Sequence, residues 1–68
     1  MKGALLRVRE GLVVVPYAPT RHGWDCVVVE SDDTEPNRAY PVGGYNIHVF
    51  QDEIDAADRL HVHQGQGL

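Results

Sequence analysis

Hydrophobic and polar residues alternate along several short stretches of this chain, and such alternation predicts half-buried β-strands. Residues 4–9 form the first stretch, in which Arg7 and Arg9 fall on the same face. Gly11 follows and supplies the positive φ that a tight hairpin turn needs. Residues 12–17 therefore predict the second strand of a hairpin.

The apolar run at residues 12–15 does not alternate. A strand of this kind is usually covered on both faces, so we expect either a curled sheet or a neighbouring subunit to cover it. Pro16 and Pro19 are expected to end the strand, because proline cannot donate to a β-ladder. Residues 18–23 then predict a loop.

Three further strands are expected after this loop. Residues 24–30 predict a central strand, and residues 45–50 predict the last clear one. Residues 39–42 predict a very short strand that Pro41 confines to an edge of the sheet. Residues 31–38 are polar and predict an exposed turn.

The period changes after the last predicted strand. Ile54, Ala57 and Leu60 fall on one helical face, so residues 51–60 predict one short helix. Residues 61–68 are glycine-rich and polar, and we expect a flexible C-terminal tail there. The sequence thus predicts a single small β domain over residues 1–60, built as a five-stranded barrel or curled sheet with one short C-terminal helix or helical turn.

This order of elements resembles that of the SH3-like small β-barrels, in which the last strand passes into a short helical turn. The resemblance covers roughly residues 4–60 and rests on element order and hydrophobic pattern. Small barrels of this kind occur in unrelated proteins, so the resemblance implies a fold and leaves the function open.

The short length limits the core that the chain can bury. A chain of 68 residues and 7.6 kDa has room for one domain, and Cys26, its single cysteine, cannot form an internal disulfide. Self-association into a homo-oligomer is therefore an expected source of extra stability. The sequence shows neither a signal peptide nor an apolar stretch of membrane-spanning length, so we expect a cytoplasmic protein without a membrane partner.

The net charge of −4 disfavours a general nucleic-acid binder, because lysine and arginine supply most non-specific affinity for phosphate. The first 24 residues nevertheless carry an excess of positive charge. They include a basic set that could form a nucleic-acid-binding surface: Lys2, Arg7, Arg9 and Arg21. The alternative is an edge strand whose charges prevent aggregation.

Aromatic residues beside predicted loops suggest a different surface. Small barrels can use clustered aromatic side chains to hold an extended peptide or partner protein. The candidates here are Tyr17, Trp24, Tyr40 and Tyr45. The alternative is that they pack over the open ends of the barrel.

Two histidine features suggest metal binding or catalysis. His61 and His63 have a spacing that could chelate one metal ion, but a structural zinc site needs about four ligands, and solvated histidines are the alternative. The segment Ile47-His48-Val49-Phe50 resembles the core strand of the type II dihydrofolate reductases, Val-Gln-Ile-Tyr, which form one shared active pore per tetramer. His48 and Phe50 replace the hydrogen-bonding glutamine and tyrosine of that strand.

The common catalytic and phosphate-binding motifs are absent from the sequence, and it indicates no cofactor. We therefore expect a non-catalytic interaction or regulatory module that binds a protein partner or itself. A nucleic-acid-binding barrel is the first alternative. An enzyme whose site forms only across an oligomer interface, with His48 as its candidate residue, is the second.

Overall fold

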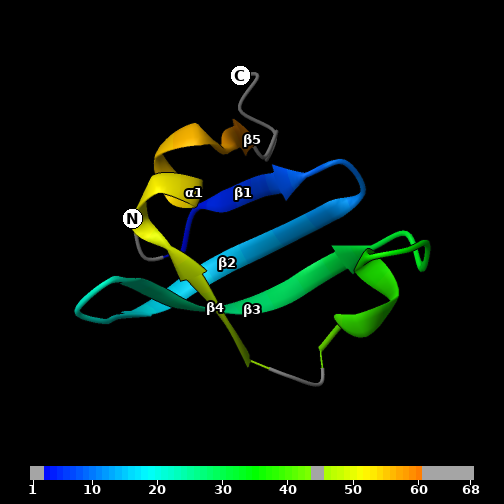
Figure 1. Ribbon diagram of the computed structural model, residues 1–68, viewed down its shortest axis with the longest axis horizontal. Coiled ribbons are helices and arrows are strands. Elements are labelled where there is room, and N and C mark those ends of the chain that lie inside the picture. The colour runs from blue at the N-terminus through cyan, green and yellow to red at the C-terminus, as the bar shows by residue number, and fades with distance from the viewer. Residues whose placement is uncertain (1–2, 44–45, 61–68) are drawn as a thin grey trace, which may run out of the picture.

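The computed structural model describes residues 3–43 and 46–60 of the chain. Five antiparallel strands form one sheet, accompanied by one short α-helix (Figure 1). The strands are β1 (Leu5–Arg9), β2 (Leu12–Pro19), β3 (Gly23–Ser31), β4 (Asn46–Phe50) and β5 (Asp58–Leu60). The α-helix is α1 (Gln51–Ala56), and a 3₁₀ helix, η1, spans Asn37–Ala39.

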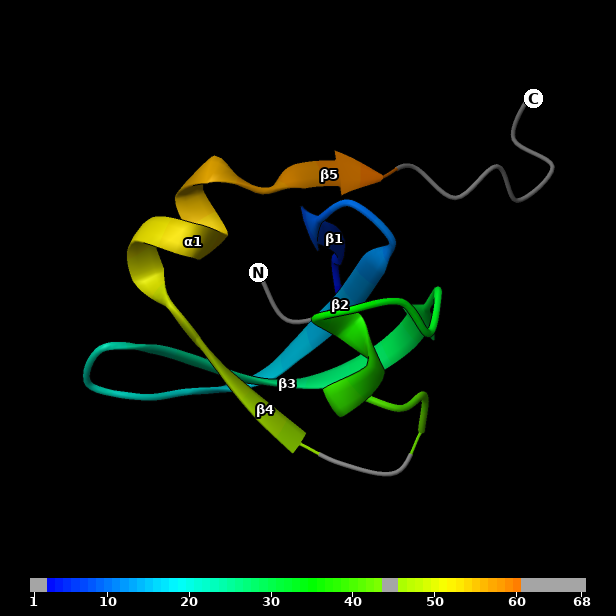
Figure 2. The ribbon, with the colours of Figure 1, turned by 45° about the vertical axis from the view of Figure 1, so that its right-hand side comes forward.

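The strand order in the sheet is β4-β3-β2-β1-β5, so β4 and β5 are its two edges. The helix α1 connects these two edge strands (Figure 2). The mainly β prediction is confirmed, and the sheet is not closed into a barrel.

Register shifts bend this sheet at three places. One lies between Arg7 and Arg9 in the β1–β2 ladder, and the other two lie between Val13 and Val14 and between Pro16 and Ala18 in the β2–β3 ladder. An extra residue on one strand bends that strand and increases its twist. The three shifts therefore curl the sheet around its concave face.

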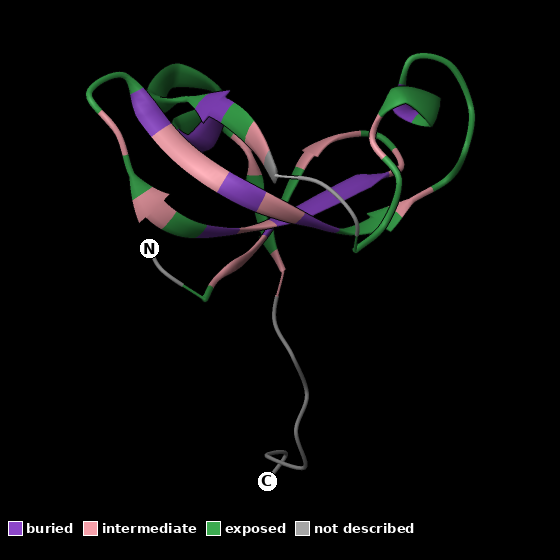
Figure 3. Ribbon diagram, turned by 90° about the horizontal axis from the view of Figure 1, so that it is seen from below, coloured by how far each residue is buried: buried purple, intermediate pink, exposed green. Residues whose placement is uncertain are grey.

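The core occupies this concave face, beneath α1. Its buried members are Leu6, Leu12, Val14, Cys26, Val28, Val49 and Ile54. Buried positions follow β2 and β3 along much of their length (Figure 3). The non-alternating run of β2 is accounted for within one chain, because Leu12, Val13 and Val14 are all buried in the curled sheet.

The predicted end of the second strand is wrong. β2 continues through Pro16 to Pro19, where Pro16 pairs with Cys26 of β3. β1 pairs with β2 only at residues 12–14, so the later half of β2 has no strand on that side. A missing proline N–H costs little at such an edge position.

Two other element predictions are also wrong. Residues 39–42 do not form a strand, and η1 occupies the start of that segment. The predicted helix 51–60 ends at Ala56, and Asp58–Leu60 pairs with β1 as the fifth strand. The spacing of the apolar residues favours a helix there, but the segment pairs with β1 instead. This pairing satisfies backbone hydrogen-bonding groups of both β5 and β1.

The loop between β3 and β4 is attached to the β1–β2 hairpin by the buried side-chain amide of Asn37 and by the Asp32 N–H, which donates to the Gly11 carbonyl at 3.0 Å. Most of residues 31–38 are exposed as predicted, but Asn37 is only 2% exposed. Its Nδ2 group donates to the Glu10 carbonyl at 2.8 Å and to Asp32 Oδ1 at 3.0 Å. Gly11, at φ +78°, leaves room for this contact, because a Cβ there would overlap the Asp32 carboxylate.

A second glycine lets β4 approach β3 closely. A Cβ on Gly23 would overlap the Val49 carbonyl oxygen and would lie 2.8 Å from the Phe50 Cα, and both are backbone atoms of β4. Backbone atoms cannot rotate away as the end of a side chain can. The position of β4 in the sheet therefore depends on the missing side chain at residue 23.

We expect Gly23→Ala to destabilise the protein by about 3 kcal/mol, since β4 must move away from β3 to relieve this overlap. Gly43→Ala is the control: it also strains the backbone, at φ +75°, but its Cβ meets no atom within 4 Å. It should cost only about 1 kcal/mol. Urea unfolding followed by tryptophan fluorescence measures both, and equal losses would contradict the close approach.

The Asn37 contact also predicts a pH dependence of stability. The hydrogen bond from the Asn37 side chain, followed by those from Thr34, lowers the pKa of Asp32 below its usual value. Because the folded pKa lies below the unfolded one, the resulting stabilisation is complete above the unfolded pKa and is lost as the pH falls through the folded pKa.

The protein should lose stability between about pH 5 and pH 2, in part because Asp32 becomes protonated. We expect the Asp32→Asn variant to lose less stability than the unchanged protein over this range. Asp33→Asn is the control at the next residue. It leaves the contact between Asp32 and Asn37 in place, so its stability should fall with pH as in the unchanged protein. Thermal unfolding across this pH range compares the two variants. A steeper loss in Asp32→Asn than in the unchanged protein is the opposite of what this contact predicts.

Candidate functional site

A groove runs along β4 and is more enclosed than the open depression beside it. Its volume is about 180 Å³. It is lined by Val8 and Arg9 of β1, by Tyr40, by residues 47–50 of β4 and by Glu53 of α1. Pockets for drug-sized ligands usually exceed about 300 Å³, so this groove, which we call the β4 groove, fits side chains better than a whole cofactor.

Arg9 enters the β4 groove because of the register shift in β1. Arg7 pairs with Val13, but Arg9 pairs with Leu12, whose side chain is in the core. Paired residues project from the same face of a sheet. Arg7 and Arg9 therefore lie on opposite faces, and the regular alternation expected for residues 4–9 is broken at Val8.

The Arg9 guanidinium lies over the ring of Tyr40, with Cζ 5.5 Å from the ring centroid. A cation over an aromatic face contributes about 1 kcal/mol at a partly exposed site. Tyr40 is itself half-buried and packs against the core. The pair thus forms a fixed wall of the groove that joins the end of β1 to the loop before β4.

The outer edge of β4 forms the opposite wall. Gln51 N–H donates to the His22 carbonyl at 2.9 Å, which continues the hydrogen bonding between β3 and β4. Backbone groups in an antiparallel ladder point alternately toward and away from the paired strand. The N–H and C=O groups of His48 and Phe50 consequently point away from β3, and the Phe50 N–H donates to Glu53 Oε1 at 3.0 Å.

Two aromatic rings cover the outer face of β4. His48 and Phe50 meet edge to face, with ring centroids 4.9 Å apart. The Thr20 hydroxyl and His48 Nε2 are hydrogen-bonded at 2.8 Å, which ties the β2–β3 hairpin to β4. Phe50 remains 54% exposed, so a large apolar side chain stands in solvent beside the groove.

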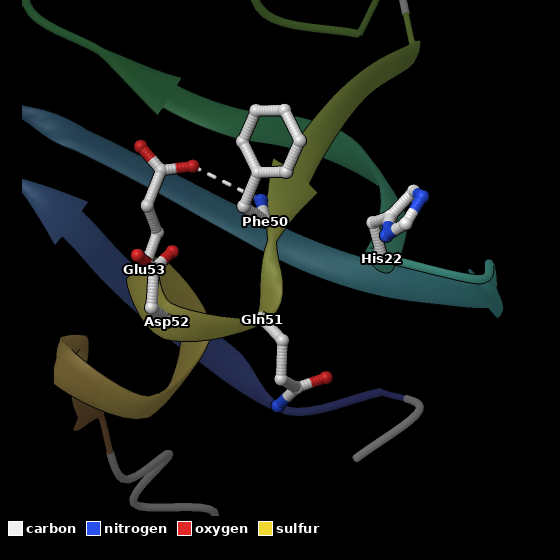
Figure 4. Close-up of a pocket in the computed structure, with 5 residues that line it drawn as sticks. All are labelled: His22, Phe50, Gln51, Asp52 and Glu53. Atoms are coloured by element: carbon white, nitrogen blue, oxygen red, sulfur yellow. Dashed lines mark hydrogen bonds between the residues drawn. The ribbon is translucent and has the colours of Figure 1, made fainter.

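An open depression adjoins the β4 groove where β4 passes into α1. It is lined by His22, Phe50, Gln51, Asp52 and Glu53 (Figure 4). Phe50 and Glu53 line both hollows, so the two lie next to each other. Charge changes along this surface, from Arg9 in the groove to Asp52 and Glu53 in the depression.

The structure separates the three predicted aromatic residues that it describes. Tyr40 lines the β4 groove, whereas Trp24 pairs with Val49 and packs against the core. Tyr17 is 36% exposed at the register shift in β2. Tyr45 lies outside the described residues. Of the described three, only Tyr40 belongs to the candidate site.

The predicted basic residues do not form a continuous stripe in the described part of the chain. Besides the opposite faces of Arg7 and Arg9, Arg21 lies in the exposed turn after β2, at the far end of β2 from the pairing of Arg7. Lys2 lies outside the described residues. The sequence pattern suggested one surface because it contains no sign of the shift at Val8.

The candidate metal ligands His61 and His63 also lie outside the described residues. Within residues 3–43 and 46–60, no three metal-binding side chains are grouped to hold an ion. Cys26 is buried in the core, and its burial, with a smaller effect of Asp25, raises its thiol pKa to about 11. A thiol in that state is a poor nucleophile.

Phe50 and Glu53 line the candidate site but were not among the binding residues predicted from the sequence. The sequence did contain an indication for Phe50, because it is a large aromatic residue on the otherwise polar face of the last predicted strand. The contact of Glu53 with the Phe50 N–H depends on the start of α1 at Gln51, because that start places Glu53 in the first helical turn, three residues after Phe50.

Comparisons with models of protein families, with curated proteins and with solved structures find no match to this chain. Within the described residues no helix is long and apolar enough to cross a membrane. The geometry of the β4 groove and of the depression beside it is therefore the basis for assigning a function.

Proposed function

We propose that the protein is a small, non-catalytic interaction module that holds a segment of a protein partner in the β4 groove. The observation that carries the proposal is the position of the groove: it lies between an outer strand edge and the Arg9–Tyr40 pair, with exposed Phe50 at its side. Exposed aromatic and arginine side chains around a pocket are typical of energetically important positions in protein interfaces.

The curled sheet fits an SH3-like small barrel that is left open between its edge strands β4 and β5. Modules of this kind hold partners on the rim of the sheet through aromatic grooves. The fold assignment and the binding function are parts of the same proposal, because the opening of the sheet is what leaves the β4 groove accessible.

Nucleic-acid binding receives less support. Arg7 and Arg9 lie on opposite faces, and Arg9 is already engaged with Tyr40. An enzyme built on His48 is also less well supported: its ring contacts Thr20 and Phe50 on an exposed surface. Catalytic sites are generally enclosed, so that water is excluded from the reacting groups.

A library of random twelve-residue peptides displayed on phage tests the proposal directly. We expect selection on the full chain to enrich a family of related sequences, and Phe50→Ala to weaken their binding about tenfold. Tyr17→Ala is the matched control, because Tyr17 is an exposed strand aromatic outside the groove. Enriched peptides that tolerate Phe50→Ala but not Tyr17→Ala would place the binding surface elsewhere.

Light scattering behind a sizing column separates a foreign partner from a second copy of the chain. A constant mass of 7.6 kDa over a wide concentration range would rule out a second copy as the occupant of the groove. Formation of a dimer that Phe50→Ala disrupts would assign it to self-association. Both results keep the groove as the binding surface.

A further inference from the structure

The outer edge of β4 has backbone groups suited to pairing with another strand. The His48 N–H and C=O point away from β3, as derived above from the Gln51–His22 hydrogen bond. The Phe50 N–H is already bound by Glu53. A strand added to this edge would therefore pair with His48 and would end near Phe50, where α1 begins.

The side chains around this edge favour charges in a defined order. Among the described residues the ion pairs all involve Arg38, so half-buried Arg9 has an aromatic neighbour and no carboxylate partner. At the other end, where β4 passes into α1, Asp52 lines the depression and Glu53 lines both the depression and the groove. A segment that follows β4 would meet a positive charge at one end and negative charges at the other.

We infer that the partner segment binds in an extended conformation as a sixth strand on the β4 edge, with an acidic side chain at Arg9 and a basic side chain at Asp52 and Glu53. The inference rests on the proposed function and specifies its ligand. Main-chain hydrogen bonds supply affinity in this mode of recognition, while alternate side chains supply specificity. The side chains that face inward would contact Val8 and Tyr40 in the groove.

A segment of another protein can pair with the charges of Arg9, Asp52 and Glu53 better than the β4 strand of a second copy can. The sequence of β4, Asn-Ile-His-Val-Phe, contains no acidic or permanently charged side chain. A symmetric β4–β4 contact would consequently leave Arg9 without a carboxylate from the added strand. Charge complementarity thus selects a partner with charged residues that flank a short strand-forming run.

Synthetic peptides test this inference on the full chain. The probes are acetylated, amidated hexapeptides in which four alternating valine and threonine residues separate a terminal glutamate from a terminal lysine, made in both sequence orders. Binding is followed by ¹H–¹⁵N spectra of the labelled protein. We expect one order to bind more tightly and to shift the His48 amide, because charge pairing fixes the strand direction.

Two arginine variants and a modified peptide provide the controls. Arg9→Gln should weaken the preferred peptide about fivefold, whereas Arg7→Gln, on the opposite face, should change it less than about twofold. N-methylation of the peptide amide that faces His48 should abolish binding, and N-methylation of the next amide should not. This alternation is specific to a paired strand.

Failure of both hexapeptides to shift the His48 amide at millimolar concentration would overturn the inference. Equal effects on binding of N-methylation at the two peptide amides would overturn it as well. So would equal effects of Arg7→Gln and Arg9→Gln. A phage-selected peptide that depends on Phe50 but leaves the His48 amide unchanged would retain the groove function and reject strand addition.

Discussion

The register shift at Val8 is the constraint on which the candidate site depends. Without it, Arg9 would project from the same face as Arg7, and the end of β1 would present two positive charges to solvent. With it, Arg9 pairs with Leu12 and its guanidinium lies over Tyr40. A one-residue change in pairing moves a side chain across the sheet, and here it converts a basic stripe into one wall of a groove.

The same kind of shift solves the packing problem of so short a chain. A flat sheet of five short strands would leave one apolar face uncovered, but the bends in the β1–β2 and β2–β3 ladders curl it around a single core. α1 then covers the remaining opening with Ile54. The curl stops before the edges meet, and this leaves β4 with an unpaired side next to the groove.

Sequence reasoning recovered the β class and four of the strands because their alternation is local. It failed where distant pairing decides the outcome. Asp58–Leu60 became a strand because the edge of β1 was available to it, and Pro16 was tolerated because no strand pairs with β2 on that side. Asn37 appeared to belong to an exposed turn, since its partners Glu10 and Asp32 come together only in the folded chain.

The candidate site was less predictable than the fold for the same reason. Tyr40 and Arg9 were both selected from the sequence, but for different functions, and only the shift at Val8 brings them together. Phe50 and Glu53 became relevant once the start of α1 was known. A bulge position is not encoded by hydrophobic alternation, because a single extra residue changes the face of each residue that follows it.

The most direct test of this account is a nuclear Overhauser spectrum of the labelled full chain, recorded for the side-chain protons of the two arginines in β1. The account predicts cross-peaks between the Arg9 side chain and the Tyr40 ring, upfield shifts of those Arg9 protons, and neither effect for Arg7. Cross-peaks that place the Arg9 and Arg7 side chains on one face, with none from Arg9 to Tyr40, would contradict it.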